Sequence, residues 1–94
     1  MTVPILWLPR AEAELNQILD HIEHESPQRA LTMALAILQG ANGFLSTYPQ
    51  AGRIGRIKGT RELVIRATPF IVVYRVRIDR VEILRVIHGK QKFP

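Results

Sequence analysis

The sequence predicts an α+β fold in the order β-α-α-β-β-β, with a helical hairpin packed on one face of an antiparallel sheet. Two observations lead to this prediction. Apolar residues recur at helical spacing in the first half of the chain, whereas β-branched residues alternate in the second half. Proline and glycine mark the boundaries between segments. The chain has 94 residues, enough for one core, so we expect residues 1–94 to form a single domain.

The N-terminal half is predicted to hold a short strand and two helices. The stretch Thr2–Leu8 is β-prone, and Pro9 precedes a helix over roughly 10–24, since proline is tolerated at the first helical position. The apolar residues of this helix recur at helical spacing: Ala11, Leu15, Ile18, Leu19 and Ile22. Ser26 is the expected N-cap of a second helix, about 27–46, which begins with a proline.

The second helix is apolar over an unusually wide part of its circumference. Leu31 and Leu35 widen its apolar stripe, and no charged residue occurs between Arg29 and Arg53. Such a helix is expected to be buried on more than one side. Either the sheet and the first helix wrap it closely, or a partner protein covers part of it.

Three strands are predicted in the C-terminal half: Arg61–Arg66, Phe70–Ile78 and Val81–Ile87. Asp79-Arg80 forms a short hairpin connection between the last two. Alternation in the middle strand gives one face that is entirely apolar and is expected in the core: Phe70, Val72, Tyr74 and Val76. The other face is half apolar and half basic: Ile71, Val73, Arg75 and Arg77. We expect this second face to meet a polyanion or a partner protein.

The charge of the chain is segregated. Residues 1–52 hold two basic and five acidic side chains, whereas residues 53–94 hold eleven basic and three acidic ones. This distribution indicates an acidic partner, which includes nucleic acid, a nucleoprotein assembly or an acidic protein. The chain has no cysteine, which excludes disulfides and thiolate zinc sites. No apolar run approaches the roughly 20 residues of a membrane span, so we expect a cytoplasmic protein without a membrane segment.

The glycine-rich run from Gly52 to Gly59 resembles a phosphate-binding loop only superficially. It lacks the Gly-Lys-Ser/Thr ending, and no helix follows it. We expect Arg53, Arg56 and Lys58 to project from a tight turn as a basic ridge that grips phosphates. The alternative is a solvated edge strand guarded by charge against aggregation.

The sequence indicates no metal site and no cofactor. His21 and His24 lie three residues apart on a helix, but no third ligand accompanies them. His88 ends a strand close to Arg85, and two roles are open to it: a general acid in RNA cleavage, or a strand-end histidine bonded to the backbone. Two further acids, Glu62 and Glu82, lie among arginines, and we interpret them as members of structural ion pairs.

Nearly the whole chain resembles the toxins of the RelE/ParE superfamily, the toxic halves of bacterial type II toxin–antitoxin modules. The segments that carry the resemblance most specifically are Gly59–Leu63, Pro69–Val76 and Val81–His88. The opening strand with Trp7 and the helix that begins at Ala11 add to it. The resemblance implies a small toxin held inactive by a cognate antitoxin, which is acidic and ParD-like or similar and wraps around the toxin.

The superfamily has two activities. RelE-like members cut messenger RNA on the ribosome, and ParE-like members poison DNA gyrase. Nuclease members typically carry an arginine at the position of Ile71, and many have an aromatic hydroxyl near the C-terminus, where this chain has Phe93. Because isoleucine cannot stabilise a developing negative charge, the resemblance favours the ParE-like activity.

We expect the gyrase-binding residues to be the basic ridge and the tail: Arg53, Arg56, Lys58, Arg61, His88, Lys90 and Lys92. The antitoxin is expected to cover Leu31 and Leu35 on the helices and Arg75 and Arg77 on the sheet.

The alternative is a ribosome-dependent mRNA endoribonuclease, with Arg61 and Arg85 as phosphate clamps and His88 as the acid. A non-toxic interaction module or decayed toxin is a third interpretation.

Overall fold

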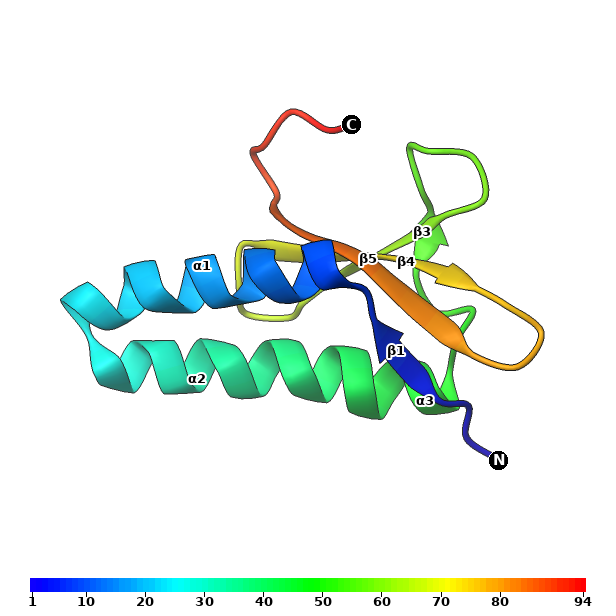
Figure 1. The fold of residues 1–94 in the computed structure, drawn as a ribbon, viewed down its shortest axis with the longest axis horizontal. Coiled ribbons are helices and arrows are strands. Elements are labelled where there is room, and N and C mark those ends of the chain that lie inside the picture. Colours follow the sequence, from blue (N-terminus) through cyan, green and yellow to red (C-terminus); the bar gives the residue numbers. More distant parts are fainter.

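A computed structural model describes residues 1–94. The elements in chain order are β1 (Ile5–Trp7), α1 (Pro9–Glu25), α2 (Pro27–Leu38), the π-helical stretch η1 (Gln39–Phe44), α3 (Leu45–Thr47), β2 (Arg53–Ile54), β3 (Arg61–Val64), β4 (Phe70–Val76) and β5 (Val81–His88). Figure 1 shows α1 and α2 as an antiparallel hairpin lying along the sheet, with the turn between them projecting beyond it. The predicted α+β fold is confirmed.

The sheet differs from the prediction in one pairing and one strand. Its order is β1-β5-β4-β3-β2, and β1 pairs with β5 in parallel, so the sheet is mixed and not antiparallel throughout. The chain runs from β1 straight into α1, which packs on β5, and this path sets the direction of β1. The additional strand, β2, is a two-residue edge strand at the start of the glycine-rich run.

Both helix starts match the sequence signals. Pro9 opens α1, and the Ser26 Oγ accepts a hydrogen bond from the backbone N–H of Arg29 at 3.2 Å. The second helical stretch runs from residue 27 to 47 through η1. Within η1, a Cβ on Gly40 would lie 2.7 Å from the Cδ1 of Ile65, so the absent side chain lets this helix approach the sheet closely.

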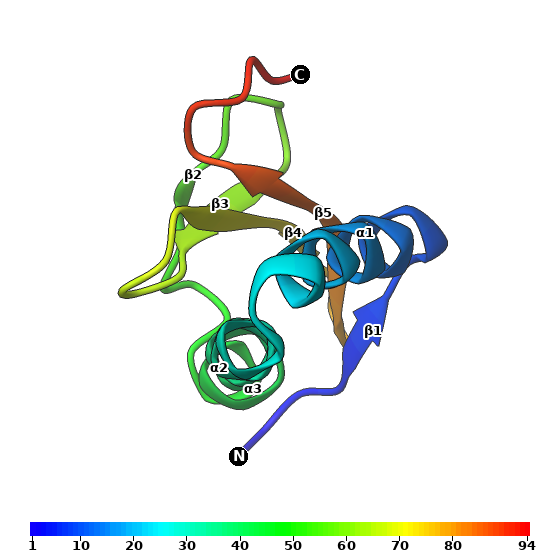
Figure 2. The same cartoon turned by 90° about the vertical axis from the view of Figure 1, so that its left-hand side faces the viewer.

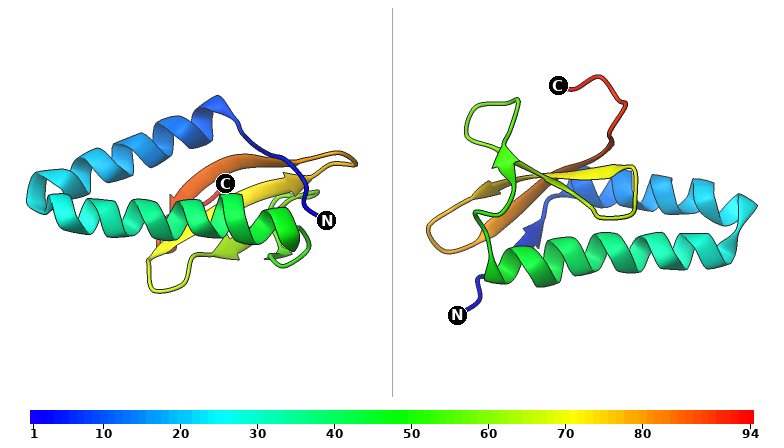
Figure 3. Two further views of the ribbon diagram at one scale, coloured as in Figure 1. Left: turned by 90° about the horizontal axis from the view of Figure 1, so that it is seen from below. Right: turned by 180° about the vertical axis from the view of Figure 1, so that it is seen from behind.

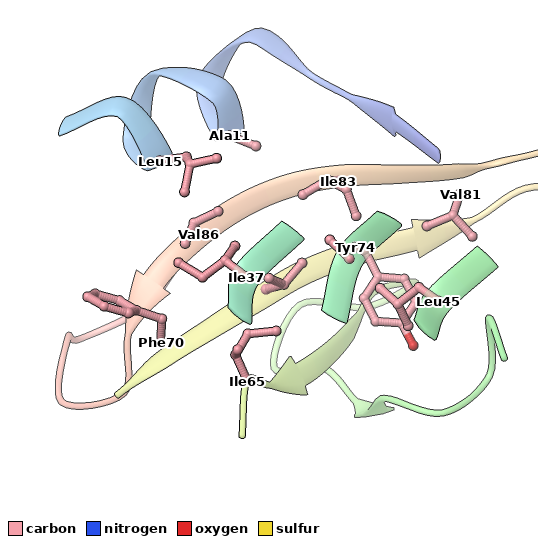
Figure 4. Packing of buried hydrophobic residues seen from close by; sticks show 12 residues of the cluster. Ala11, Leu15, Ile37, Leu45, Ile65, Phe70, Tyr74, Val81, Ile83 and Val86 are labelled. Carbon is pink, nitrogen blue, oxygen red and sulfur yellow. The ribbon is translucent and has the colours of Figure 1, made fainter. Parts of the chain in front are cut away.

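The main core lies between the helical hairpin and the sheet (Figure 4). It contains Ala11 and Leu15 from α1, Ile37 from α2, Leu45 from α3, Ile65 after β3, and Phe70, Val72, Tyr74, Val81, Ile83 and Val86 from β4 and β5. The apolar face predicted for the middle strand therefore packs against the helices. Leu31 and Leu35 lie outside this core.

The opposite face of the sheet, here called the outer face, is covered in part by the C-terminal tail. Phe93 packs in a second, smaller cluster with Ile71, Val73 and Ile87. Figure 2 shows the tail beside the loop 55–60, away from α2, and Figure 3 (right) shows the same arrangement from behind. The expectation that the apolar half of this face meets a partner is corrected, because the protein's own tail buries it.

The expectation that no apolar stretch approaches the length of a membrane span is corrected for one helical stretch. Pro27–Thr47 has 21 residues and is long and apolar enough to cross a membrane by length and composition alone. Core helices of soluble proteins and signal sequences meet the same criterion, and 22% of the apolar window, including Ala30, Ile37 and Ala41, is buried in this structure.

Candidate partner-binding surface

Three ion-pair clusters, each centred on one carboxylate, lie on the outer face or at its edge beside α1. In the first, Glu62 accepts hydrogen bonds from Arg53 Nη2 at 2.9 Å, Arg56 Nε at 3.1 Å and the Arg56 backbone N–H at 2.9 Å. Its side chain is only 1% exposed. Hydrogen bonding by Arg56 is the main reason that the pKa of Glu62 falls to about 2. Two arginines of the predicted basic ridge are thus bound to a carboxylate of the same chain.

The second cluster surrounds Glu82 near the β4–β5 hairpin. Arg75 Nη2 lies 2.8 Å from Glu82 Oε1, Arg80 Nη2 lies 2.8 Å from Oε2, and Arg77 Nε lies 3.3 Å from Oε1. The hydrogen bonds from Arg75 are the first cause of the lowered pKa of Glu82, about 2. Three guanidinium groups on one carboxylate leave an excess of positive charge, which Asp79 offsets only in part through Arg80. The structural role predicted for both Glu62 and Glu82 is confirmed.

The third cluster joins α1 to β5. Arg85 Nη2 lies 2.7 Å from Glu14 Oε2, and the Glu14 carboxylate also accepts the backbone N–H of Val86 at 3.1 Å. This pair connects the helical layer to the strand edge.

The ring of Phe93 lies between two of these clusters. The guanidinium carbons of Arg56 and Arg85 are each 5.1 Å from its centroid, which is within the range of a cation–π contact. The ring therefore links the Glu62 cluster to the Glu14 cluster.

The lysines of the candidate surface are its free charges. Lys58 in the loop 55–60 and Lys90 and Lys92 in the tail are exposed, and none of them forms an ion pair in the structure. The loop and the tail that carry these lysines lie side by side (Figure 2), and Arg56 of the loop contacts the ring of Phe93 in the tail. Glu62 offsets one of the two positive charges of Arg53 and Arg56, whereas the three lysines have no counter-ion at all. The target-binding role expected for these residues stays a prediction.

Arg61 is turned toward the chain that precedes β2. Its Nη1 donates to the carbonyl oxygens of Gly52 at 2.7 Å and Gln50 at 3.2 Å. The buried Tyr74 hydroxyl holds the same segment, since it donates to Pro49 O at 2.9 Å and accepts from the Gly52 N–H at 2.8 Å. Arg61 thus has structural acceptors on the main chain.

The structure does not gather the three residues suggested for RNA cleavage. Arg61 is paired with Tyr74, which faces the main core, whereas Arg85 is paired with Val73 on the outer face. Residues paired across neighbouring strands share a face, so Arg61 and Arg85 lie on opposite sides of the sheet. The third residue, His88, contacts the edge of the Phe70 ring and accepts the Lys90 backbone N–H at Nδ1, 3.1 Å away.

The predicted antitoxin-binding residues are split between two regions. Leu31 is 62% exposed and Leu35 is 50% exposed on α2, whereas Arg75 and Arg77 belong to the Glu82 cluster on the outer face. A further apolar groove lies between the helices and β3, and is lined by Ala36, Gly40, Phe44, Leu63, Val64 and Ile65. β2 pairs only with Arg61 and Glu62, so Leu63 and Val64 of β3 are paired with β4 on one side and have no strand on the other.

Sequence reasoning missed three members of the surface: Glu14, Arg80 and Phe93. Glu14 had a detectable signal, because it is an acid on the apolar side of α1, three residues from Ala11 and four from Ile18. Phe93 was considered only for its missing hydroxyl, and a single aromatic residue near a chain end does not indicate where it packs. The position of Arg80 in a turn gave no sign of its contact with Glu82.

The family model described as "ParE toxin of type II toxin-antitoxin system, parDE" matches residues 5–93. The chain therefore belongs to the ParE toxin family.

Named relatives and solved structures agree with this assignment. The chain is 42% identical to the Sinorhizobium fredii protein named "Putative toxin Y4kP", over 96% of this chain and 92% of that protein. It is 37% identical to toxin RelE2 of Caulobacter vibrioides, over 90% of this chain and 93% of the relative.

Two toxin–antitoxin structures share the fold. The chromosomal ParDE system from P. aeruginosa matches with a TM-score of 0.81 and 28% identity, covering 93% of this chain and 96% of that one. The RelBE2 complex from Mycobacterium tuberculosis matches with a TM-score of 0.64 and 27% identity, covering 94% and 99%.

Proposed function

We propose that this toxin inhibits growth by ParE-like poisoning of DNA gyrase in the cytoplasm, and that a cognate antitoxin neutralises it. The observation that carries the proposal is the separation of Arg61 from Arg85 by the sheet. A general acid–base nuclease needs its phosphate clamps and its proton donor around one scissile bond. The absence of such an arrangement supports a toxin that acts by binding.

The exposed lysines supply the attraction for an acidic nucleoprotein target. Lys58, Lys90 and Lys92 have no internal counter-ion, so their field extends into solvent and steers an acidic partner toward the loop and the tail. The buried Ile71 is consistent with this proposal, because an apolar side chain under Phe93 offers no charge to a phosphate.

The antitoxin is proposed to cover Leu31 and Leu35 and to offer acids to Arg75 and Arg77. Both leucines are at least half exposed on a helix whose only charged residue is Arg29, and such an apolar surface is unfavourable in water. The excess positive charge around Glu82 suits an acidic partner segment. The ParDE match to a toxin–antitoxin system supports this partner.

A purified gyrase reaction with supercoiled plasmid and ATP tests the proposal. Linear DNA should accumulate with the wild-type protein, and messenger RNA should stay intact in a parallel ribosome reaction. The variant Lys58→Glu/Lys92→Glu should lose trapping, whereas Arg29→Glu, an exposed reversal on α2, should retain it. Arg56 is unsuitable for charge reversal because Arg56→Glu would place a second carboxylate against Glu62.

A RelE-like endoribonuclease is the second candidate, favoured by the similarity to toxin RelE2 and to the RelBE2 complex. In that case the ribosome reaction would yield cleaved messenger, with gyrase unaffected. The variant His88→Ala would then lower the cleavage rate by about 10²-fold or more. A gyrase-binding toxin should tolerate this substitution.

A further inference from the structure

The last aromatic residue of the chain is buried outside the main core. β5 ends at His88, and Phe93 is the only buried residue after it, with 8% of its surface exposed. Its ring packs on Ile71, Val73 and Ile87. Apolar contact accounts for the burial of the ring but not for the charged groups beside it.

The ring is flanked by Arg56 and Arg85, each with its guanidinium carbon 5.1 Å from the centroid. Each arginine is also held by a carboxylate, Arg56 by Glu62 and Arg85 by Glu14. A carboxylate bonds to the N–H edge of a guanidinium group, whereas an aromatic ring contacts its flat face. The two kinds of contact therefore restrain different motions of the same side chain.

These contacts form a continuous path from α1 to the loop 55–60. Its order is Glu14, Arg85, Phe93, Arg56 and Glu62. Without the ring, the Glu14 and Glu62 clusters have no contact with each other along this path. Arg56 depends more on the ring for its restraint than Arg85 does, because 39% of the Arg56 side chain is exposed, against 14% of the Arg85 side chain.

We propose that Phe93 is a positioning residue of the toxin: its ring holds Arg56 and Arg85 in the arrangement that the outer face presents to the target. Its importance for target binding rests on the proposed function, but the restraint on the arginines does not. Phe93 acts through the arginines and through the placement of the tail that carries Lys92.

The restraint is tested by NMR on the ¹⁵N-labelled full chain. In the wild type, the Nε–H protons of Arg56 and Arg85 should be shifted upfield by the ring, and their heteronuclear NOE values should be high. Phe93→Leu keeps an apolar side chain on the sheet but removes the ring, so the NOE of Arg56 should fall. Phe93→Tyr should restore the shifts and the NOE.

The matched control is Phe44→Leu, which removes an aromatic ring on the helical side and should leave both arginine signals unchanged. The proposal is overturned if the wild-type signals show no upfield shift. It is also overturned if Phe93→Leu leaves the NOE of both arginines at the wild-type value.

The gyrase reaction tests the consequence for the target. Phe93→Leu should raise the concentration for half-maximal DNA trapping at least about fivefold, and Phe93→Tyr should restore it. If Phe93→Leu traps DNA as potently as the wild type although the NOE of Arg56 has fallen, Phe93 has no role in target binding. If the wild type itself traps no gyrase, the proposed function fails, and the arginine signals alone decide whether Phe93 restrains the outer face.

Discussion

Arg85 Nη2 lies 2.7 Å from Glu14 Oε2, which joins two residues 71 positions apart in the chain. The same carboxylate accepts the Val86 N–H. β1 covers β5 only at Val81–Ile83, so the remaining edge of β5 has no neighbouring strand. Glu14 provides a charged acceptor there, and α1 thereby protects an edge that would otherwise be open to pairing with another chain.

Glu14→Gln should lower the free energy of unfolding by about 1–3 kcal/mol, because the amide loses the charge-assisted bonds to Arg85. Urea unfolding measures the change. Glu23→Gln is the matched control, since Glu23 is an exposed acid of α1 without an ion pair, and its effect should stay within about 0.5 kcal/mol. Equal effects of the two substitutions would show that the Glu14–Arg85 contact adds nothing to stability.

Gly52→Ala should destabilise the protein by about 1–3 kcal/mol through overpacking. A Cβ at this position would lie 2.6 Å from the Tyr74 hydroxyl and 2.9 Å from the Glu62 carbonyl oxygen. Gly43→Ala is the control, because a Cβ there meets nothing within 4 Å and alanine is the better helix former. Thermal unfolding of both variants should show a lower midpoint for Gly52→Ala alone.

Stability should fall in acid partly through Glu62. Its pKa is about 2 in the folded protein against an ordinary value of 4.5. Because the pKa of Glu62 is lower in the folded protein than in the unfolded chain, its carboxylate stabilises the folded protein fully at pH values above about 4.5. This contribution is lost as the pH falls from about 4.5 toward 2. Glu62→Gln should make the free energy of unfolding depend less on pH in this window. Part of the pH dependence should remain, because the pKa of Glu82 is also lowered to about 2.

The matched control for this measurement is Asp20→Asn, which removes an exposed carboxylate of α1 without an ion pair. It should leave the pH dependence as in the wild type. If the free energy of unfolding of Glu62→Gln depends on pH as steeply as that of the wild type, Glu62 does not have a lower pKa in the folded protein than in the unfolded chain.

Leu31→Ser/Leu35→Ser should weaken binding of the cognate antitoxin at least about tenfold, because two partly exposed leucines lose apolar contact area. Isothermal titration calorimetry measures the affinity. Ile54→Ser is the control, since Ile54 is also exposed but lies on the edge strand β2, outside the proposed antitoxin-binding residues. Undiminished binding by the double variant would remove the leucines from the antitoxin surface.

The order of elements and their boundaries could be predicted closely, because local signals determine them. The signals that predict α1 and α2 each lie within one or two turns of helix: Pro9, Ser26 and the spacing of the apolar residues. The pairing of Glu62 and Glu82 with arginines was predictable for the same reason, since carboxylates in strands crowded with arginine have few other partners.

The candidate site was predicted less well, because its geometry depends on contacts between distant segments. The lysines of the loop and the tail were identified as basic, but only the fold shows that Arg53 and Arg56 share the counter-ion Glu62 while Lys58 has none. Likewise, Arg61 and Arg85 both lie in predicted strands, and only the register of β3 and β5 on β4 puts them on opposite faces.

The sequence by itself determined the fold class, the two helices, the three principal strands and the segregation of positive charge into residues 53–94. The tertiary structure alone decided that β1 runs parallel to β5, that the tail covers the outer face, and that Phe93 lies between Arg56 and Arg85. The physical reason is the separation of the interacting residues along the chain. Helix caps and side-chain periodicity depend on near neighbours in the sequence. Edge pairing, tail docking and the choice of counter-ion depend on distant segments, which come together only in the assembled core.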